Sequence, residues 1–235
     1  MEHYFTNKEN IDKGKLLIIG DEARHLYQVL RKKTGEEIFV TDGERNLYKT
    51  IIERIAKDKV ECIIIESFYN INEPEKEITL YQSLLKNPAR FELVIEKATE
   101  LGVYEIVPII TENVVNKTTD KTERWQSIAL SAMKQSQRCY LPKINSPIIF
   151  TEAIKKPTGS PLKLIADEKK SDLSSQIINF KTNDNLISVF IGPEGGFTPK
   201  EVDNAVENGF KILNLGKRKL RSETAGILIV GLLLN

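Results

Sequence analysis

The chain has 235 residues, of which 29% are charged and 40% hydrophobic, and its formal net charge is +1. This length allows one large domain, or a large and a small one, and the composition is that of an ordinary soluble protein rather than a disordered one. Positive and negative residues nearly balance both before and after residue 72, so a nucleic-acid surface would have to be a local patch.

Cysteine usage and hydropathy exclude several further classes of protein. Cys62 and Cys139 stand far apart and have no ligand-like neighbours, which indicates neither a disulfide framework nor a metal site and fits a reducing compartment. The first ten residues are polar and do not resemble a signal peptide. The longest apolar run, residues 227–234, is too short to span a bilayer. We therefore expect a cytoplasmic protein with no metal and no membrane partner.

The first 72 residues predict a β-rich domain. Its strand-like runs, separated by glycine-marked turns, are residues 16–19, 37–40, 47–52 and 60–67. One helix, near residues 22–31, interrupts these strands. Several short strands with turns between them are typical of a small barrel or sandwich. The helix ends in Arg31, Lys32 and Lys33, a basic cluster that either stabilises the helix C-terminus or contacts phosphates.

Residues 70–76 predict a linker, because Pro74 stands there among several charges. From residue 78 onward strands and helices alternate, which indicates an α/β domain with a mainly parallel sheet. The expected strands are residues 78–84, 103–110, 162–166, 188–191 and 210–215. The expected helices are one through residues 91–101 that ends at Gly102, one at residues 121–138, one that begins at Thr198 and one at residues 225–234.

Two of these strands end in glycine-marked loops that lead into helices. The first loop is Gly192-Pro193-Glu194-Gly195-Gly196, after which a threonine and a glutamate have the spacing of a capping box. The second begins at Gly216, and Ser222 or Thr224 is placed to cap the last helix. Open α/β sheets bind ligands at the carboxyl ends of their strands, so we expect a ligand site at these two loops.

The residues of the two loops favour some ligands over others. Neither the dinucleotide fingerprint G-x-G-x-x-G nor the phosphate loop G-x-x-x-x-G-K-[ST] occurs in the expected place. Glu194 among the glycines suits a ligand with amine, hydroxyl or sulfonium character, or it is a solvated residue of a tight turn. The second loop holds four cations between a strand end and a helix start, where unpaired backbone N–H groups attract anions. These cations, which favour a phosphate-bearing partner, are Lys217, Arg218, Lys219 and Arg221.

Two motifs at their spacing near the C-terminus are highly specific in combination, I-G-P-E-G-G-F at residues 191–197 and L-R-S-E-T-A at residues 220–225. Shorter matches are His25-Leu26, Val29-Leu30-Arg31, E-K-A-T-E-L-G-V at residues 96–103, Arg124-Trp125, Gln135-Ser136 and Arg138. With these residues the chain resembles the RsmE family within the SPOUT class of S-adenosylmethionine-dependent RNA methyltransferases. That family methylates N3 of a uridine in 16S ribosomal RNA.

The resemblance implies a PUA-like RNA-binding domain at residues 1–72 and a SPOUT α/β domain with a deep trefoil knot at residues 73–235. It also implies a homodimer that binds S-adenosylmethionine in the knot and acts on the 16S rRNA of the small ribosomal subunit. The cofactor-binding residues that it implies are Leu164, Ala166, Ile191, Gly192, Pro193, Gly195, Gly196, Leu215, Gly216, Leu220, Ser222 and Thr224.

The chemistry of methyl transfer to N3 suggests roles for individual charged residues. The methyl group of S-adenosylmethionine is already activated by its sulfonium, so no metal is required and catalysis is mainly positioning. We expect Arg221 to stabilise negative charge on the uracil oxygens, while Glu194 and Glu223 are both candidates to accept the N3 proton or only to fix their loops. The candidates for RNA phosphate contacts are Arg31, Lys32, Lys33, Arg138, Lys217 and Arg218.

Three positions depart from the family pattern. Asn113 and Val114 stand where the family usually has Arg-Ser. If that arginine normally contacts RNA, part of the RNA contact is either altered here or supplied by Lys117. Ser222 replaces the usual threonine and keeps its hydroxyl group.

Three other functions agree less well with the sequence. A transfer RNA ribose methyltransferase of the same class would not have the PUA-like front half. A non-catalytic RNA-binding protein has no reason to retain both motifs. A metabolic enzyme with a nucleotide cofactor would need the absent phosphate-loop motifs.

Overall fold

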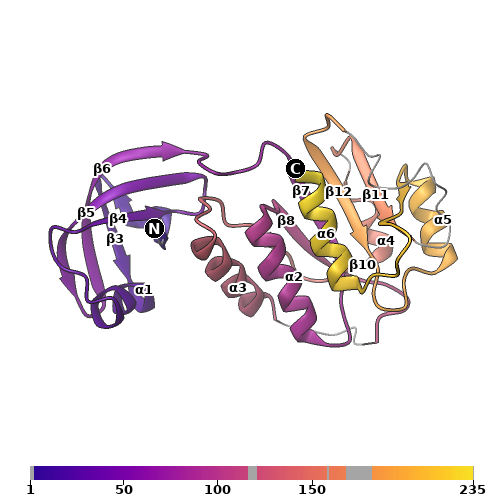
Figure 1. Cartoon of the computed structure of the whole chain (residues 1–235), viewed down its shortest axis with the longest axis horizontal. Coiled ribbons are helices and arrows are strands. Elements are labelled where there is room, and N and C mark those ends of the chain that lie inside the picture. The colour runs from indigo at the N-terminus through magenta and orange to yellow at the C-terminus, as the bar shows by residue number, and fades with distance from the viewer. Residues whose placement is uncertain (1–2, 116–120, 158, 168–181, 235) are drawn as a thin grey trace. The chain divides into compact units, whose positions relative to one another are not determined.

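The computed structural model describes residues 3–115, 121–157, 159–167 and 182–234 (Figure 1). The chain divides into two compact units, one made of Met1–Glu73 with Leu130–Leu141 and the other of Pro74–Ala129 with Pro142–Asn235. The sequence alone predicts a single boundary near residue 72. The segment Leu130–Leu141 joins the first unit because its backbone and side chains bind the end of the Met1–Glu73 segment, as described below.

The described part of the first unit forms a six-stranded sheet in the order β1-β4-β5-β6-β3-β2. β1 and β4 are parallel, and the other neighbours are antiparallel. The strands are β1 (His3–Phe5), β2 (Ile11–Asp12), β3 (Lys15–Ile19), β4 (Glu37–Thr41), β5 (Asn46–Ala56) and β6 (Lys59–Tyr69). The four expected strands are confirmed. β1 and β2 escaped prediction because two or three residues are too few to show an alternating pattern.

The helical part of the first unit packs on this sheet. α1 (Gly20–Arg24) continues directly into a π-helical turn, η2 (His25–Val29), and a short 3-10 turn, η1 (Lys8–Asn10), precedes β2. Leu26 of η2 is fully buried against Ile18 and Ile52 of the sheet. The helix expected near residues 22–31 is therefore present, and it ends where Arg31 takes a left-handed conformation with a φ of 51°.

The second unit contains a parallel sheet whose described strands follow the order β10-β8-β7-β12-β11-β13, with β9 beside β8. The strands are β7 (Glu77–Ser83), β8 (Glu105–Ile110), β9 (Lys143–Ile144), β10 (Ile148–Ile149), β11 (Leu162–Ala166), β12 (Leu186–Ile191) and β13 (Lys211–Leu213). The expected α/β class with a parallel sheet is thus confirmed. Because all these strands run the same way, β11, β12 and β13 end at one edge of the sheet.

Helices cover both faces of this sheet. They are α2 (Pro88–Leu101), α4 (Phe150–Ala153), α5 (Pro199–Glu207) and α6 (Ser222–Leu234), whereas α3 (Thr122–Gln135) begins in this unit and from Leu130 onward belongs to the first unit. α2 and α6 pack side by side on one face (Figure 1). On the other face, α4 and α5 cover an aromatic core in which Tyr81 stacks on Phe190 with ring centroids 4.1 Å apart. None of the helices in the described ranges is long and apolar enough to cross a membrane.

Local signals explain where several helices begin and end. Gly102 caps α2 in the left-handed conformation with a φ of 109°, as its position after the periodic residues predicted. Thr198 and Glu201 form a full capping box at the start of α5, which confirms that prediction. α3 ends at Gln135 rather than at residue 138, because Gln137 takes a left-handed φ of 58° and turns the chain.

Candidate functional site

A cavity of about 500 Å³ lies at the carboxyl ends of β11, β12 and β13. This is the edge at which open α/β sheets bind ligands, and the volume suits a small-molecule cofactor. Its walls are the end of β11, the loop after β12, the loop after β13 and the first turns of α6. The lining residues are Ala166, Asp167, Ile191, Gly192, Pro193, Glu194, Gly195, Gly196, Phe197, Leu213, Asn214, Leu215, Gly216, Arg218, Lys219, Leu220, Arg221, Ser222 and Ala225.

The loop after β12, residues 192–197, is tightly folded on itself. The backbone N–H of Gly196 donates to the carbonyl of Pro193 at 2.9 Å, and Gly196 has a left-handed φ of 71°. A Cβ atom at Gly192 would lie 3.2 Å from the backbone of Gly196 and from Phe197, so only glycine fits there without displacement. The glycines therefore let the loop close, and the loop then leads into the capped helix α5.

The loop after β13, residues 214–221, carries the cavity's cations. Gly216 has a φ of 116°, and its N–H donates to the side chain of Asn214 at 2.8 Å. Arg218, Lys219 and Arg221 are exposed and line the cavity. Asp167 and Glu194 line it as well, so charges of both signs surround the cavity. A ligand with both cationic and anionic groups would suit this arrangement.

Most of the residues that the sequence implied for a cofactor come together in this cavity. The ten that line it are Ala166, Ile191, Gly192, Pro193, Gly195, Gly196, Leu215, Gly216, Leu220 and Ser222. Leu164 and Thr224 do not line it. Leu164 is fully buried within β11, and Thr224 is exposed on the first turn of α6.

The three proposed catalytic residues have different surroundings. Arg221 and Glu194 line the cavity, whereas Glu223 does not. The Glu194 carboxylate accepts a hydrogen bond from the backbone N–H of Lys86 at 3.1 Å, which ties its loop to the segment that follows β7. The Glu223 carboxylate is buried and lies 3.5 Å from Nε of Arg90. Of the two acids, Glu194 is the one that a ligand in the cavity can reach.

The basic residues expected to contact RNA fall into separate groups. Arg218 lines the cavity and Lys217 is exposed beside it. Arg31 and Lys33 are exposed in the first unit. Lys32 pairs with Glu36, whose carboxylate lies 2.9 Å from Nζ and also accepts the backbone N–H of Lys33. These two hydrogen bonds lower the pKa of Glu36, and the pairing partly neutralises the cluster.

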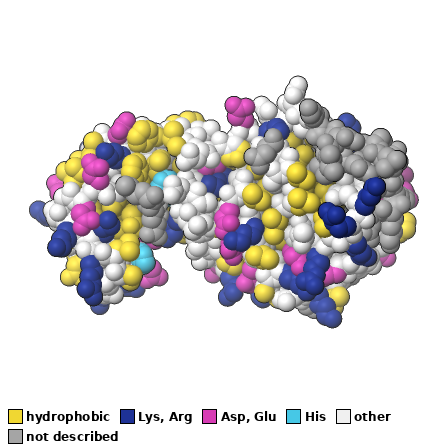
Figure 2. Space-filling model, in the orientation of Figure 1, with side chains coloured by type: hydrophobic (Ala, Val, Ile, Leu, Met, Phe, Trp, Pro, Cys, Tyr) yellow, Lys and Arg dark blue, Asp and Glu magenta, His cyan; other side chains and the backbone are white. Residues whose placement is uncertain are grey.

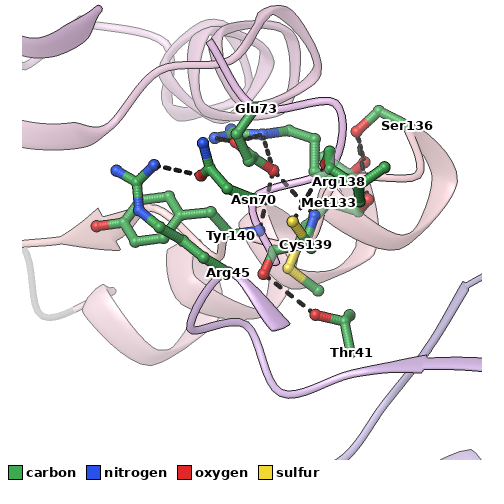
Figure 3. Close-up of polar contacts among 11 residues, drawn as sticks. Thr41, Arg45, Asn70, Glu73, Met133, Ser136, Arg138, Cys139 and Tyr140 are labelled. Atoms are coloured by element: carbon green, nitrogen blue, oxygen red, sulfur yellow. Dashed lines mark hydrogen bonds and ion pairs between the residues drawn. The ribbon is translucent and has the colours of Figure 1, made fainter. Parts of the chain in front are cut away.

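Arg138 does not lie on a surface that RNA can reach, which corrects the expectation from sequence. It is 3% exposed, and its Nη2 and Nε donate to Oε2 of Glu73 at 2.6 and 3.0 Å (Figure 3). Oε1 of Glu73 accepts the backbone N–H groups of Cys139 and Tyr140 at 2.9 and 3.0 Å. A phosphate would therefore have to displace a carboxylate that is already fully paired, so Arg138 is a structural residue of the first unit.

Asn113 and Val114, which replace the family's usual Arg-Ser, contact the cavity loop and the core, respectively. The side-chain N–H of Asn113 donates to the carbonyl of Gly196 at 3.0 Å. A Cβ atom added at Gly195 would lie only 3.3 Å from the Cβ of Asn113, so the two residues are closely packed. Val114 is buried. Lys117, the alternative RNA contact, lies outside the described residues.

Several residues of the cavity were not among the expected cofactor residues. Asp167, Leu213 and Asn214 directly continue or precede residues that were, so the rule that strand ends meet at one edge could have included them. Phe197 closes the first loop and Ala225 lies one turn into α6. In the described ranges, no group of three or more His, Cys, Asp or Glu side chains could hold a metal ion.

Comparisons with known proteins relate the whole chain to one family. Residues 72–234 match the family model described as an RNA methyltransferase domain, and residues 18–65 match the one described as an RNA methyltransferase PUA domain. Ribosomal RNA small subunit methyltransferase E of Mesomycoplasma hyopneumoniae is 38% identical over 98% of this chain and 97% of its own length. The protein of the same name from Aquifex aeolicus is 35% identical over 99% of both chains.

Solved structures agree with this relationship. Ribosomal RNA small subunit methyltransferase E from Neisseria gonorrhoeae, determined bound to S-adenosyl methionine, superimposes with a TM-score of 0.88 at 30% identity. The match covers 98% of this chain and 95% of that one. A Legionella pneumophila protein determined in complex with the bound cofactor SAM gives a TM-score of 0.85 at 29% identity, over 97% and 94% of the two chains.

Proposed function

The chain belongs to the ribosomal RNA small subunit methyltransferase E family, or RsmE family, and on that premise we propose that it methylates N3 of a specific uridine in 16S rRNA with S-adenosylmethionine as methyl donor. The observation that carries the proposal is the cavity itself. Two glycine loops from the family's most specific motifs meet there, at the strand ends, with a volume that suits a cofactor of this size.

The residues of the cavity fit the proposed cofactor. The glycines at 192, 195 and 196 bring the backbone of the first loop to the cavity wall, where main-chain groups can bind an adenine or a ribose. Asp167 and Glu194 suit the cationic parts of S-adenosylmethionine, and Arg218 and Lys219 of the second loop suit its carboxylate. When bound, the cofactor would supply a methyl group that its sulfonium has already activated.

The chain's own residues then have to position the base and manage one proton. N3 of uracil loses a proton as it gains the methyl group, and negative charge develops on the neighbouring oxygens. Arg221, exposed at the cavity, would stabilise that charge. Glu194 would accept the proton, directly or through water, because this residue lines the cavity, whereas the Glu223 carboxylate lies beside Arg90.

RNA would be held by phosphate contacts. Arg218 at the cavity wall and Lys217 beside it are candidates, and the PUA-like first unit contributes Arg31, Lys32 and Lys33. The target base has to leave its RNA stack to reach the cavity, as in other enzymes that modify bases. We assign RNA binding to the PUA-like segment, residues 1–72, and catalysis to residues 73–235.

We also propose that the enzyme is a homodimer with a trefoil knot at its C-terminal end, as its family implies. Support for self-association comes from α2 and α6, where Leu93, Leu101, Leu228 and Leu232 are each at least 36% exposed. Figure 2 shows hydrophobic side chains gathered over these two helices. An apolar face of this kind on adjacent helices suits a second copy of the chain. Light scattering after size exclusion would give the mass of a dimer.

The experiment that tests the function compares three RNA substrates. Purified protein is incubated with labelled S-adenosylmethionine and either undermodified small ribosomal subunits, naked 16S rRNA or transfer RNA, and the methylated nucleoside is identified by mass spectrometry. We expect N3-methyluridine in the subunit or in its rRNA. Label in transfer RNA would overturn the substrate, and cofactor binding without methylation of any RNA would overturn the assignment as an active enzyme.

A further inference from the structure

Two buried hydrogen bonds, Gln82–Ser222 and Ser222–Gly192, connect the sheet to both cavity loops. Nε2 of Gln82, near the end of β7, donates to Oγ of Ser222 at 2.9 Å and to the carbonyl of Ser83 at 3.3 Å. The hydroxyl of Ser222 in turn donates to the carbonyl of Gly192 at 2.5 Å. Gln82 is fully buried and Ser222 is 6% exposed, so water does not compete with these bonds.

The donor and the acceptor of each of these two hydrogen bonds are fixed by chemistry. A carbonyl oxygen can only accept, so the single hydroxyl proton of Ser222 must go to Gly192. Ser222 then has only lone pairs left for Gln82, which has to present its NH₂ group and not its oxygen. A glutamate or a methionine at position 82 could not make this contact.

The hydrogen bonds Gln82–Ser222 and Ser222–Gly192 connect the two loops that form the cavity. Gly192 is the first residue of the loop after β12, and Ser222 ends the loop after β13 and begins α6. Gln82 belongs to β7, which lies between β8 and β12 in the sheet, and it pairs with Ile191 in register. The Ser222 hydroxyl group thus holds both loops to β7, a central strand of the sheet.

The packing around Gln82 supports this role. A Cβ atom on Gly226 would collide with Oε1 of Gln82, so the glycine lets α6 lie directly on the carboxamide. Oε1 has no hydrogen-bond partner among the described residues. An unpaired polar atom in the core costs stability. Such a cost is expected where the Nε2 atom of the same side chain is needed to hold a functional site in place.

We propose that Gln82 is a positioning residue of the cofactor cavity, which acts through Ser222 to set the separation of the two loops. The proposal rests on the proposed function in that the cofactor is S-adenosylmethionine. Gln82 is not part of the cavity wall, so it touches neither cofactor nor base. It follows that the Ser222 hydroxyl has no proton left to donate to the cofactor.

The test uses Gln82→Met, which keeps the volume and removes the donor, and Ser222→Ala, with Ser222→Thr as the variant that retains the hydroxyl. Thr79→Val, at the opposite end of β7, is the matched control. Titration calorimetry should show S-adenosylmethionine affinity reduced about tenfold in Gln82→Met and Ser222→Ala, the size expected for one buried hydrogen bond. Ser222→Thr, which retains the hydroxyl, and Thr79→Val should bind like the wild type, and Thr79→Val should also keep the wild-type turnover.

A double variant shows whether Gln82 and Ser222 affect cofactor binding through the same hydrogen bonds or independently. Gln82→Met combined with Ser222→Ala should bind the cofactor no more weakly than either single variant, since both remove the same connection. Additive losses, or unchanged affinity in Gln82→Met, would overturn the proposal. If the wild type does not bind S-adenosylmethionine, the proposed function fails first. Hydrogen exchange still tests the role of Gln82 in that case, because the backbone N–H groups of Gly192 and of residues 194–197 should lose protection in Gln82→Met but not in Thr79→Val.

Discussion

Arg138 and Glu73 form a buried ion pair with Nη2 and Oε2 2.6 Å apart, and their side chains are only 4% and 2% exposed. The carboxylate also holds two backbone N–H groups, so each of its oxygens is paired. The charges stabilise the first unit only as a complete set, because either one alone would remain buried without compensation.

Removing one charge of this pair should strongly destabilise the protein. Glu73→Gln keeps the shape but removes the negative charge beside the buried guanidinium, and we expect a loss of about 3–5 kcal/mol in the free energy of unfolding. Urea denaturation measures this change. Glu44→Gln is the matched control, since its partner Lys8 lies at the same 2.6 Å but both side chains are more than half exposed, and it should have little effect. Equal losses in the two variants would contradict a special role for burial.

Arg221→Ala should reduce turnover much more than cofactor binding. Removal of one charge-stabilising donor at the reacting atoms typically lowers kcat about 100-fold or more. Calorimetry of S-adenosylmethionine binding should change less than about threefold, because the loops keep their hydrogen bonds. Steady-state kinetics on small subunits measures the first effect, and a variant with normal kcat would remove Arg221 from the mechanism.

Asn113→Ala should weaken cofactor binding moderately. The variant removes the hydrogen bond to the Gly196 carbonyl and the packing on Gly195, both at the rim of the first loop. We expect Kd to rise roughly three- to tenfold, the size of one hydrogen bond at an exposed position. Asn185→Ala, exposed before the amino end of β12, is the matched control and should bind normally. RNA affinity that falls in place of cofactor affinity would assign Asn113 to RNA contact.

Lys217→Ala and Arg218→Ala should weaken RNA binding in a salt-dependent way. If each side chain binds one phosphate, its removal should reduce the slope of log affinity against log salt by about 0.7–0.9. Filter binding between low and physiological salt measures the slope. Lys211→Ala, exposed on β13, serves as control. Parallel salt curves for wild type and both variants would exclude this loop from the RNA interface.

The two buried thiols should be unreactive in the folded protein. Burial raises the pKa of Cys62 and of Cys139 from 9.0 to about 11. Because the neutral thiol is favoured in the folded state, this contribution to stability is complete below pH 9 and declines as the pH rises toward 11. Ellman's reagent at about pH 8 should label neither cysteine in native protein and both in denaturant. Rapid native labelling would show that one of them is accessible.

Sequence reasoning succeeded where the signal is local. The periodic residues of α2 and the glycine after it predicted both the helix and its left-handed cap. The capping box of α5 was readable from a threonine and a glutamate three positions apart. The meeting of residues 192–197 with residues 214–222 followed from a general rule about the ends of parallel strands.

It failed where the decisive partner is distant in the chain. Arg138 looked like a cation at a helix end, and nothing near it in sequence shows that Glu73, 65 positions away, buries it. Glu223 stands in a motif that suggests catalysis, yet its carboxylate lies beside Arg90. Gln82 gave no signal, because its partner Ser222 is 140 residues away. Short strands such as β9 and β10 also escaped, since pairing with β8 and not a pattern of their own defines them.

The discontinuous composition of the first unit has a consequence for how such a protein can be recombined. A fragment that stops at residue 73 would keep the glutamate without the arginine and the two N–H groups that its carboxylate needs. The unit is therefore not a cassette that a single crossover can transfer to another enzyme. A working chimera would have to inherit residues 130–141 from the same parent, so the two segments should be exchanged together in protein engineering.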